Sequence, residues 1–348
     1  MGHVTRAAVL QAPRRLELAT RPKPVARPGE VVVRVAATAV CHTDLEIYTG
    51  RHPGVRYPVV MGHEATGVVE AAGAGVTRVR LGQRVLVNPI IACGRCDSCA
   101  RGRGNLCLEA GLLGREMDGS LAEHLVLPER YIHPLPDHLP LEAATLIETL
   151  ATVLHAQHRA RVAAGESVVV LGQGAAGLLH TQLAKLSGAS PVIAVSRSPW
   201  KLELARGMKA DQVVDAGRQD VLTAVRDATG GRGADVVIDA AGQPALIAQA
   251  IEMAAPGGRL LVYGISHHPV PGFSTFPLYF KELTVYGSRA LTPGDVEPAI
   301  DLVASGAIDL RGFVTRSYPL ARVATAFEDY ERAPEGVLRM VIVPGAEQ

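Results

Sequence analysis

Four of the five cysteines in this 348-residue chain lie in one short stretch, CGRCDSCARGRGNLC. Two residues separate Cys93 from Cys96 and Cys96 from Cys99, and seven residues separate Cys99 from Cys107. Four thiolates suit tetrahedral zinc, whose structural sites are closed by four protein ligands. An iron–sulfur cluster fits less well, because ferredoxin-type runs have a shorter last gap followed by proline, whereas Leu108 follows here. We therefore expect a structural zinc that holds a loop together, with redox or disulfide use as the other alternative.

The fifth cysteine begins a second group of candidate ligands. Cys41 lies 22 residues before His63, and Glu64 follows directly. A thiolate, an imidazole and a carboxylate can hold a zinc ion that keeps one position open for water or substrate. Taken singly, a buried free cysteine and a hydrogen-bonded core histidine would explain these residues better. The other motifs in the chain favour the catalytic metal site.

A glycine-rich segment indicates a nucleotide site. The apolar run Val168–Leu171 precedes the hexapeptide Gly172-Gln173-Gly174-Ala175-Ala176-Gly177. A G-x-G-x-x-G pattern between a strand and a helix is typical of dinucleotide binding. Gly172 permits the turn, Gly174 lets the backbone approach a pyrophosphate, and Gly177 lets the helix pack closely on the strand. The helix N-terminus then favours the phosphate charge.

The residues after the next predicted strand bear on which dinucleotide binds. NAD enzymes usually place an acidic residue there, where it holds the ribose 2′-hydroxyl. In this chain Ser196 and Arg197 occupy the position, and the first acid is Glu203. Both side chains can donate hydrogen bonds to a 2′-phosphate, so we predict a preference for NADP(H). The alternative is that Arg197 only stacks on adenine and both cofactors bind.

The pattern of apolar and turn-forming residues along the chain predicts the strands and helices that position these motifs. The first part contains short β-branched runs such as Val31–Val35 and Thr66–Glu70, separated by glycine and proline. From about Arg161, apolar strands alternate with helical stretches, which indicates a parallel, doubly wound sheet. We predict an α/β protein in which residues 1–155 and 290–348 form a β-rich domain and residues 156–289 form the dinucleotide-binding domain.

Composition excludes several classes of function. A net charge of +1 supplies no field to hold nucleic acid or an anionic membrane. No signal peptide and no apolar window of about 20 residues is present, so we expect a cytoplasmic protein without a membrane span. In that compartment clustered cysteines bind metal more often than they form disulfides.

Together these motifs resemble the zinc-dependent medium-chain alcohol dehydrogenase family, in its polyol, secondary-alcohol and threonine dehydrogenase branch. The resemblance covers essentially the whole chain. The matching segments are Cys41-His42-Thr43-Asp44, Gly62-His63-Glu64-Ala65-Thr66-Gly67-Val68 followed by Gly73 and Val76, the stretch from Cys93 to Cys107, and Ile147-Glu148-Thr149-Leu150-Ala151. It implies a GroES-like catalytic domain with a structural zinc lobe at residues 90–110, and a Rossmann domain.

The resemblance also implies roles at the catalytic zinc. Cys41 and His63 are expected ligands, and the third protein ligand is Glu64 or Glu148, with Glu64 preferred. Asp44 is expected to accept a hydrogen bond from His63 and so to fix the tautomer of the ring.

Further roles follow by the same resemblance. Thr43 is placed to take the alcohol proton and pass it through the cofactor ribose to solvent. Many relatives complete that path with a histidine where this chain has Glu46, so Glu46 or water is expected to end the relay. His42 and Arg339 match basic residues that reach the pyrophosphate.

The expected activity is hydride transfer between an alcohol/carbonyl pair and a nicotinamide cofactor, with one catalytic and one structural zinc in each chain. An NAD-linked polyol, sugar or amino-alcohol dehydrogenase is the alternative enzyme. A catalytically retired fold member that binds nucleotide or protein is the alternative from another class. The partner is a small-molecule substrate, and the family implies a homodimer or homotetramer, in which a strand near Leu283–Tyr286 pairs across a subunit interface.

Overall fold

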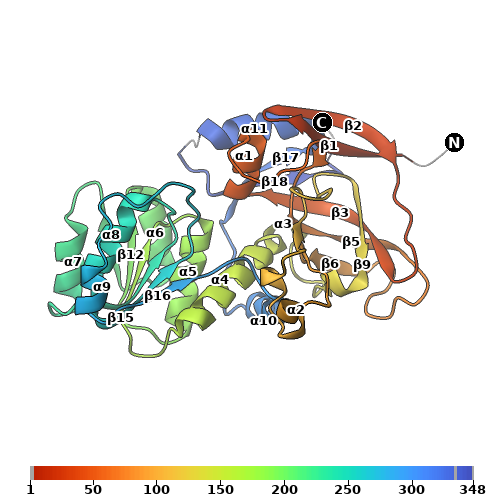
Figure 1. Ribbon diagram of the computed structural model, residues 1–348. Helices are drawn as coiled ribbons and strands as arrows, with labels where there is room; N and C mark the ends of the chain where they lie inside the picture. The colour runs from red at the N-terminus through yellow and green to blue at the C-terminus, as the bar shows by residue number, and fades with distance from the viewer. Residues whose placement is uncertain (1–3, 333–334, 347–348) are drawn as a thin grey trace. The chain divides into compact units, whose positions relative to one another are not determined.

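The structure is a computed structural model that describes residues 4–332 and 335–346 (Figure 1). The chain divides into two compact units. The first contains Met1–Ala151, Leu291–Ser305 and Leu310–Gln348, and the second contains Thr152–Ala290 and Gly306–Asp309. In the part of the chain that the structure describes, no helix is long and apolar enough to cross a membrane.

The second unit is built on a six-stranded sheet whose neighbouring strands are all parallel, in the order β13-β12-β11-β14-β15-β16. Its strands are β11 (Val168–Leu171), β12 (Val192–Ser196), β13 (Gln212–Asp215), β14 (Ala234–Asp239), β15 (Ala254–Val262) and β16 (Thr284–Gly287). Its helices are the end of α4 (Leu146–Ala160), then α5 (Ala175–Leu186), α6 (Pro199–Gly207), α7 (Val221–Ala228), α8 (Pro244–Met253) and α9 (Phe276–Phe280). All four residues of β11 are buried, as expected for a central strand covered on both faces. The predicted doubly wound sheet is confirmed.

The first unit is built on two mainly antiparallel sheets. The larger follows the order β10-β6-β5-β3-β18-β17, with β9 also paired to β3, and the smaller follows β2-β1-β4. The strands are β1 (Val4–Ala12), β2 (Arg15–Pro22), β3 (Glu30–Val40), β4 (Val59–Val60), β5 (Glu64–Ala72), β6 (Arg84–Val87), β9 (His124–Pro128), β10 (Ile132–Pro134), β17 (Val314–Pro319) and β18 (Arg339–Val343). The register places Met340 of β18 opposite Val40 of β3, so the end of the chain lies beside its beginning.

Short elements complete the first unit. They are α1 (His42–Thr49), a two-stranded ribbon of β7 (Ile90–Ile91) and β8 (Gly111–Leu112), α2 (Asp97–Ala100), α3 (Leu141–Ala144), α10 (Pro293–Ala304), α11 (Val323–Arg332) and 3₁₀ turns at 104–106, 129–131 and 320–322. Helix α1 begins with a capping box between Cys41 and Asp44, and ends at Gly50 in the left-handed conformation (φ +77°). The cap fixes Cys41 and Asp44 relative to each other.

Candidate metal and cofactor sites

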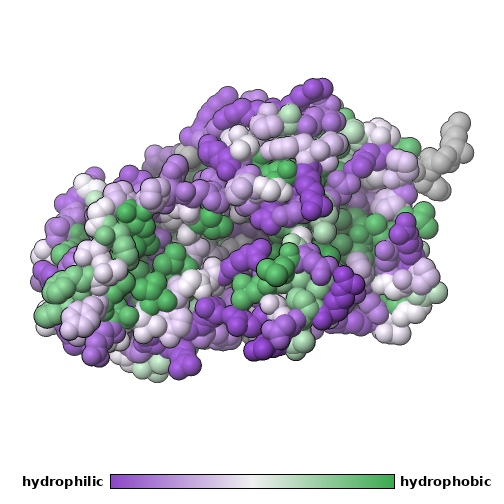
Figure 2. Space-filling view, viewed as in Figure 1, coloured by the Kyte–Doolittle hydropathy of each residue, from purple (hydrophilic) through white to green (hydrophobic). Residues whose placement is uncertain are grey.

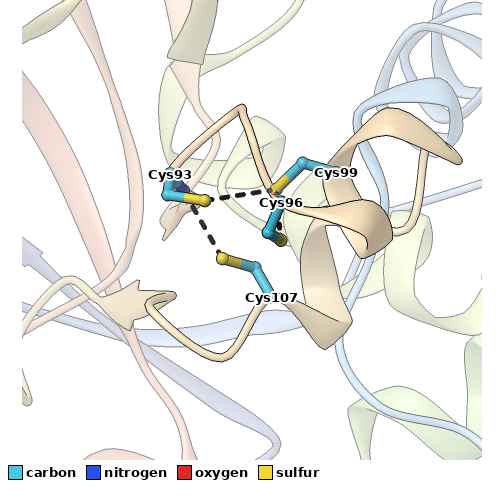
Figure 3. Close-up of side chains that lie close together, drawn as sticks. All are labelled: Cys93, Cys96, Cys99 and Cys107. Atoms are coloured by element: carbon cyan, nitrogen blue, oxygen red, sulfur yellow. Dashed lines mark hydrogen bonds between the residues drawn. The ribbon is translucent and has the colours of Figure 1, made fainter.

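The four clustered cysteines converge on one point (Figure 3). The Sγ atom of Cys99 lies 3.6 Å from that of Cys96 and 3.9 Å from that of Cys93, and all four Sγ atoms lie within 4.8 Å of one another. Zinc–sulfur bonds of about 2.3 Å in a tetrahedron place sulfurs about 3.8 Å apart. A disulfide would need about 2.05 Å, and all five cysteines are free. The spacing therefore fits one metal ion.

The environment of this lobe also suits a cation. Backbone N–H groups of Arg95 and Cys96 lower the pKa of Cys93 to about 7, whereas desolvation raises the pKa of Cys99 to about 12. A divalent cation at their centre would hold all four thiols as thiolates. The residues present fit a structural zinc.

Cys41 and His63 form the centre of the second site. Cys41 caps α1 and His63 directly precedes β5, which brings the Cys41 Sγ to 3.2 Å from the His63 Nε2. Both side chains are buried. A tetrahedral zinc bonded to both atoms would separate them by about 3.6 Å. The pair thus needs only a small adjustment to hold a metal.

Asp44 lies beside both residues of this pair. Its Oδ2 accepts a hydrogen bond from the Cys41 amide (3.1 Å), and its Oδ1 lies 3.2 Å from the His63 Nδ1. Burial lowers the pKa of His63, but the charges of Asp44 and Cys41 outweigh it and raise that pKa well above its ordinary value. With Nδ1 facing a carboxylate, Nε2 is left for a metal.

Two further carboxylates lie at the same site. Glu64 Oε1 accepts a hydrogen bond from Arg339 Nη1 (3.2 Å), while its Oε2 is buried and has no hydrogen-bond partner among the described residues. Glu148, in the first turn of α4, is buried, and burial together with the charge of Glu64 raises its pKa to about 8. With Asp44, the site contains three buried carboxylates, of which Glu64 is paired with Arg339 and Asp44 lies beside His63. A divalent cation at this site would favour the charged form of Glu148, so the residues present suit a metal ion.

The remaining residues predicted at this site lie on α1 or beside it. His42 is exposed and Thr43 is half-buried, both in the first turn of α1. Glu46 Oε1 lies 3.5 Å from the Arg51 Nε and 3.8 Å from the His42 Nε2. Arg51 was not expected here, because nothing in the local pattern distinguishes it from an ordinary surface arginine. The roles of His42, Thr43 and Glu46 stay predictions.

Arg339 was expected to reach the cofactor pyrophosphate, but its observed contacts are with other residues of the first unit. Its guanidinium is buried among Glu64, Thr149 and Val40, and it donates hydrogen bonds to all three. The sequence analysis included Thr149 in a family segment but gave it no function. A contact of Arg339 with the cofactor pyrophosphate stays a prediction.

The glycine motif adopts the geometry that its spacing predicts. Gly172 ends β11 with φ +91°, and Gly174 is the N-cap of α5. A Cβ atom added at Gly177 would lie 1.9 Å from the Gly172 carbonyl oxygen, so only glycine allows this close packing. A Cβ at Gly174 would meet nothing within 4 Å, which leaves space for a phosphate at the helix N-terminus formed by Ala175 and Ala176.

Gln173 stabilises this loop, which the sequence analysis did not anticipate. The side chain is buried; its Nε2 donates to the Val170 carbonyl (3.1 Å), and its Oε1 accepts from the Thr181 hydroxyl (3.1 Å). The only sign of this role in the sequence is that Gln173, the middle residue of the G-x-G pattern, is polar.

Ser196 ends β12 and Arg197 follows it, at the same edge of the sheet as Gly172, whose amide donates to the Val195 carbonyl. Ser196 Oγ accepts a hydrogen bond from the Ser198 amide (3.1 Å). Arg197 is exposed and makes no ion pair with any residue that the structure describes. Its guanidinium is therefore available to a ligand.

Comparison with known proteins identifies the family of the chain. The family model of the alcohol dehydrogenase GroES-like domain matches residues 27–137, and that of the zinc-binding dehydrogenases matches residues 175–305. Sorbitol dehydrogenase of Bacillus subtilis is 31% identical over 344 residues, which cover 97% of each chain.

Two solved structures extend the likeness to the fold. A zinc-binding dehydrogenase from Sinorhizobium meliloti, bound to NADP, is 31% identical with a TM-score of 0.91, over 98% of this chain and 100% of that one. An alcohol dehydrogenase from Escherichia coli CFT073, complexed with NADH, is 28% identical with a TM-score of 0.91 and the same coverage. The chain belongs to the zinc-dependent medium-chain alcohol dehydrogenase family and is an NAD(P)-dependent alcohol dehydrogenase.

Proposed function

We propose that this protein is an NADP(H)-preferring dehydrogenase that interconverts a small alcohol and its carbonyl compound, with one catalytic and one structural zinc in each chain. The observation that carries the proposal is the buried Cys41–His63 pair, 3.2 Å apart, beside three carboxylates and one arginine. The four cysteines 93, 96, 99 and 107 hold the second ion and leave it no open position.

Glu148 is the third protein ligand in this proposal, in place of the Glu64 that the sequence analysis preferred. Arg339 already neutralises Glu64, whereas no cation within the described residues lies at ion-pair distance from Glu148. A carboxyl group whose pKa is raised to about 8 by burial gains most from a metal, because the ion favours its charged form.

The residues of the chain divide the remaining work. When bound, zinc supplies Lewis acidity toward an alcohol or carbonyl oxygen, and the nicotinamide supplies hydride chemistry. Cys41 and His63 hold the metal, and Asp44 keeps the His63 Nε2 directed toward it. The Thr43 hydroxyl takes the alcohol proton. Glu46, paired with Arg51 and close to His42, is a partly exposed proton acceptor on the same helix.

The cofactor preference rests on Ser196 and Arg197. A 2′-phosphate there would meet a hydroxyl and a free guanidinium, and the first acid along the chain is Glu203, paired with Arg206. An NAD-linked polyol, sugar or amino-alcohol dehydrogenase is the alternative, which the NADH complex of the Escherichia coli relative supports.

A screen of activity tests the proposal. Purified protein is supplied with NADP⁺ or NAD⁺ and a panel of secondary alcohols, polyols and amino alcohols, and nicotinamide reduction is followed by absorbance. We expect turnover to be faster with NADP⁺ than with NAD⁺. We expect Cys41→Ser to abolish turnover. Cys96→Ser, which alters the structural zinc lobe, serves as the control for loss of the other metal. Turnover that survives in Cys41→Ser would contradict the catalytic zinc.

We also propose that the enzyme is a homodimer formed through the free edge of β16. That strand ends the six-stranded sheet, and Phe276, Tyr279 and Phe280 of the adjacent α9 are 64%, 80% and 72% exposed. Figure 2 shows hydrophobic side chains gathered over the part of the second unit that holds α8 and α9. An open sheet edge beside exposed aromatic residues favours pairing with a second copy.

A further inference from the structure

Arg339 is a buried cation that joins three separate segments of the first unit. It begins β18, and its guanidinium is 6% exposed. Nη1 donates to the Val40 carbonyl (3.3 Å) and to Glu64 Oε1 (3.2 Å), and Nη2 donates to the Thr149 hydroxyl (3.0 Å). These acceptors come from the end of β3, the start of β5 and the first half of α4.

Each of those acceptors adjoins a residue of the proposed catalytic metal site. Val40 precedes Cys41, Glu64 follows His63, and Thr149 follows Glu148. The arginine therefore touches the backbone or side chain next to every proposed ligand. A planar guanidinium with donors on several sides can bridge such acceptors, whereas a lysine ammonium offers a single point of charge.

The charge of Arg339 is held in place by its surroundings. Burial lowers the pKa of a guanidinium, but the charge of Glu64, followed by Tyr330 and Cys41, raises the pKa of Arg339 above its ordinary value. The register of β18 on β3 fixes the backbone, with Met340 opposite Val40. A buried charge with these partners is costly to move, so the three segments are tied to one point.

We propose that Arg339 is a positioning residue for the catalytic zinc, which sets the relative placement of the segments that carry Cys41, His63 and Glu148. The inference rests on the proposed function, because it takes those three residues as the ligands. It differs from the role expected by family resemblance, in which Arg339 reaches the cofactor pyrophosphate. Residues that orient metal ligands from behind typically change metal affinity about 10–100-fold when they are replaced.

Metal retention of Arg339→Gln and Arg339→Lys tests the proposal. We expect both variants to hold the catalytic zinc about 10–100-fold more weakly than the wild type, measured by competition with a chelator. The four-cysteine zinc should remain, which makes it an internal reporter of folding.

A spectroscopic measurement separates positioning from general stability. Cobalt is placed at the catalytic site, and its visible absorption bands report the ligand geometry. We expect altered bands in Arg339→Lys and unchanged bands in Arg316→Gln, which removes an exposed arginine on the neighbouring strand β17. Thr149→Val removes one anchor without removing a charge, so it supplies the test if the Arg339 variants do not fold, and we expect it to shift the bands in the same direction.

The contrary results are distinct. Arg339 variants that hold both zincs as tightly as the wild type and keep its cobalt spectrum would overturn the inference, whatever their NADPH affinity. A wild-type protein that holds only the four-cysteine zinc would overturn the proposed function itself, whatever the Arg339 variants do.

Discussion

At the scale of single residues, burial determines which groups are able to do chemistry. Cys41, His63 and Glu148 are all buried, and in the absence of a metal burial raises the pKa of both Cys41 and Glu148. The same low-polarity surroundings strengthen the attraction of these groups for a cation. The site is therefore poorly suited to stay empty and well suited to bind zinc.

Glu148 should make the metal-free protein sensitive to alkaline pH. Its pKa is raised to about 8 in the fold, from an ordinary 4.5, so the folded state holds this proton more tightly than the unfolded chain does. The stabilisation is present below about pH 4.5 and is lost as pH rises through about 8. After removal of the catalytic zinc, we expect the free energy of unfolding to fall over this range by on the order of 3–5 kcal/mol more than in Glu148→Gln. Denaturant unfolding at pH 5 and pH 8 measures this loss of stability. An equal change in the free energy of unfolding between the two pH values in both proteins would contradict the raised pKa of Glu148.

Arg197 should control the choice between NADPH and NADH. A charge-assisted hydrogen bond is worth roughly 1.5–3 kcal/mol, so Arg197→Asp should lower the NADPH-to-NADH ratio of kcat/KM about 10- to 100-fold. Steady-state kinetics with both cofactors measure the ratio. Arg206→Asp, at the far end of α6, is the matched control and should leave it unchanged. An unaltered ratio in Arg197→Asp would remove this residue from the 2′-phosphate site.

At the scale of elements, glycine has two different roles in the turn between β11 and α5: Gly177 allows close packing, and Gly174 leaves space for a phosphate. Gly177→Ala would place a Cβ 1.9 Å from the Gly172 oxygen, so we expect a loss of at least about 1–3 kcal/mol of stability. Gly174→Ala meets open space at an ordinary backbone conformation (φ −73°), so it should unfold like the wild type. Its methyl group should instead obstruct the pyrophosphate and weaken NADPH binding. Thermal unfolding and NADPH titration of both variants test this; normal NADPH affinity in Gly174→Ala would be evidence against the phosphate cradle.

These elements also show what a sequence can reveal. The turn at Gly172 and the convergence of four cysteines depend on neighbours in the chain, so spacing alone predicted them. The setting of Arg339 depends on β18 pairing with β3 and on contacts with Glu64 and Thr149, which are 275 and 190 residues away. No local pattern encodes such a contact. Similarly, nothing in the sequence shows that Arg339 neutralises Glu64 and leaves Glu148 without a cation.

At the scale of the whole molecule, the exposed face of α9 predicts self-association. Tyr279→Asp places a charge on this face, so it should shift the protein from dimer toward monomer. Sedimentation velocity over a concentration series measures the shift. Val25→Asp, at a residue that is 82% exposed in the first unit, is the control and should stay dimeric. A Tyr279→Asp variant that sediments like the wild type would place the interface elsewhere.

The two-unit architecture assigns one kind of chemistry to each unit. The first carries both proposed metal sites, and the second carries the glycine loop with Ser196 and Arg197. Hydride transfer needs both the metal site and the cofactor site. Because the two sites lie in different units, we expect each to bind its ligand when the other site is disabled. Loss of zinc in Cys41→Ser should therefore leave NADPH binding in place.

The most direct test is native mass spectrometry of the purified wild type and Cys41→Ser, each with NADPH. The account predicts two zinc ions and one NADPH in each wild-type chain, and one zinc ion and one NADPH in each Cys41→Ser chain. A wild-type chain with a single zinc, retained unchanged in Cys41→Ser, would contradict the account, because only the four-cysteine site would then hold metal.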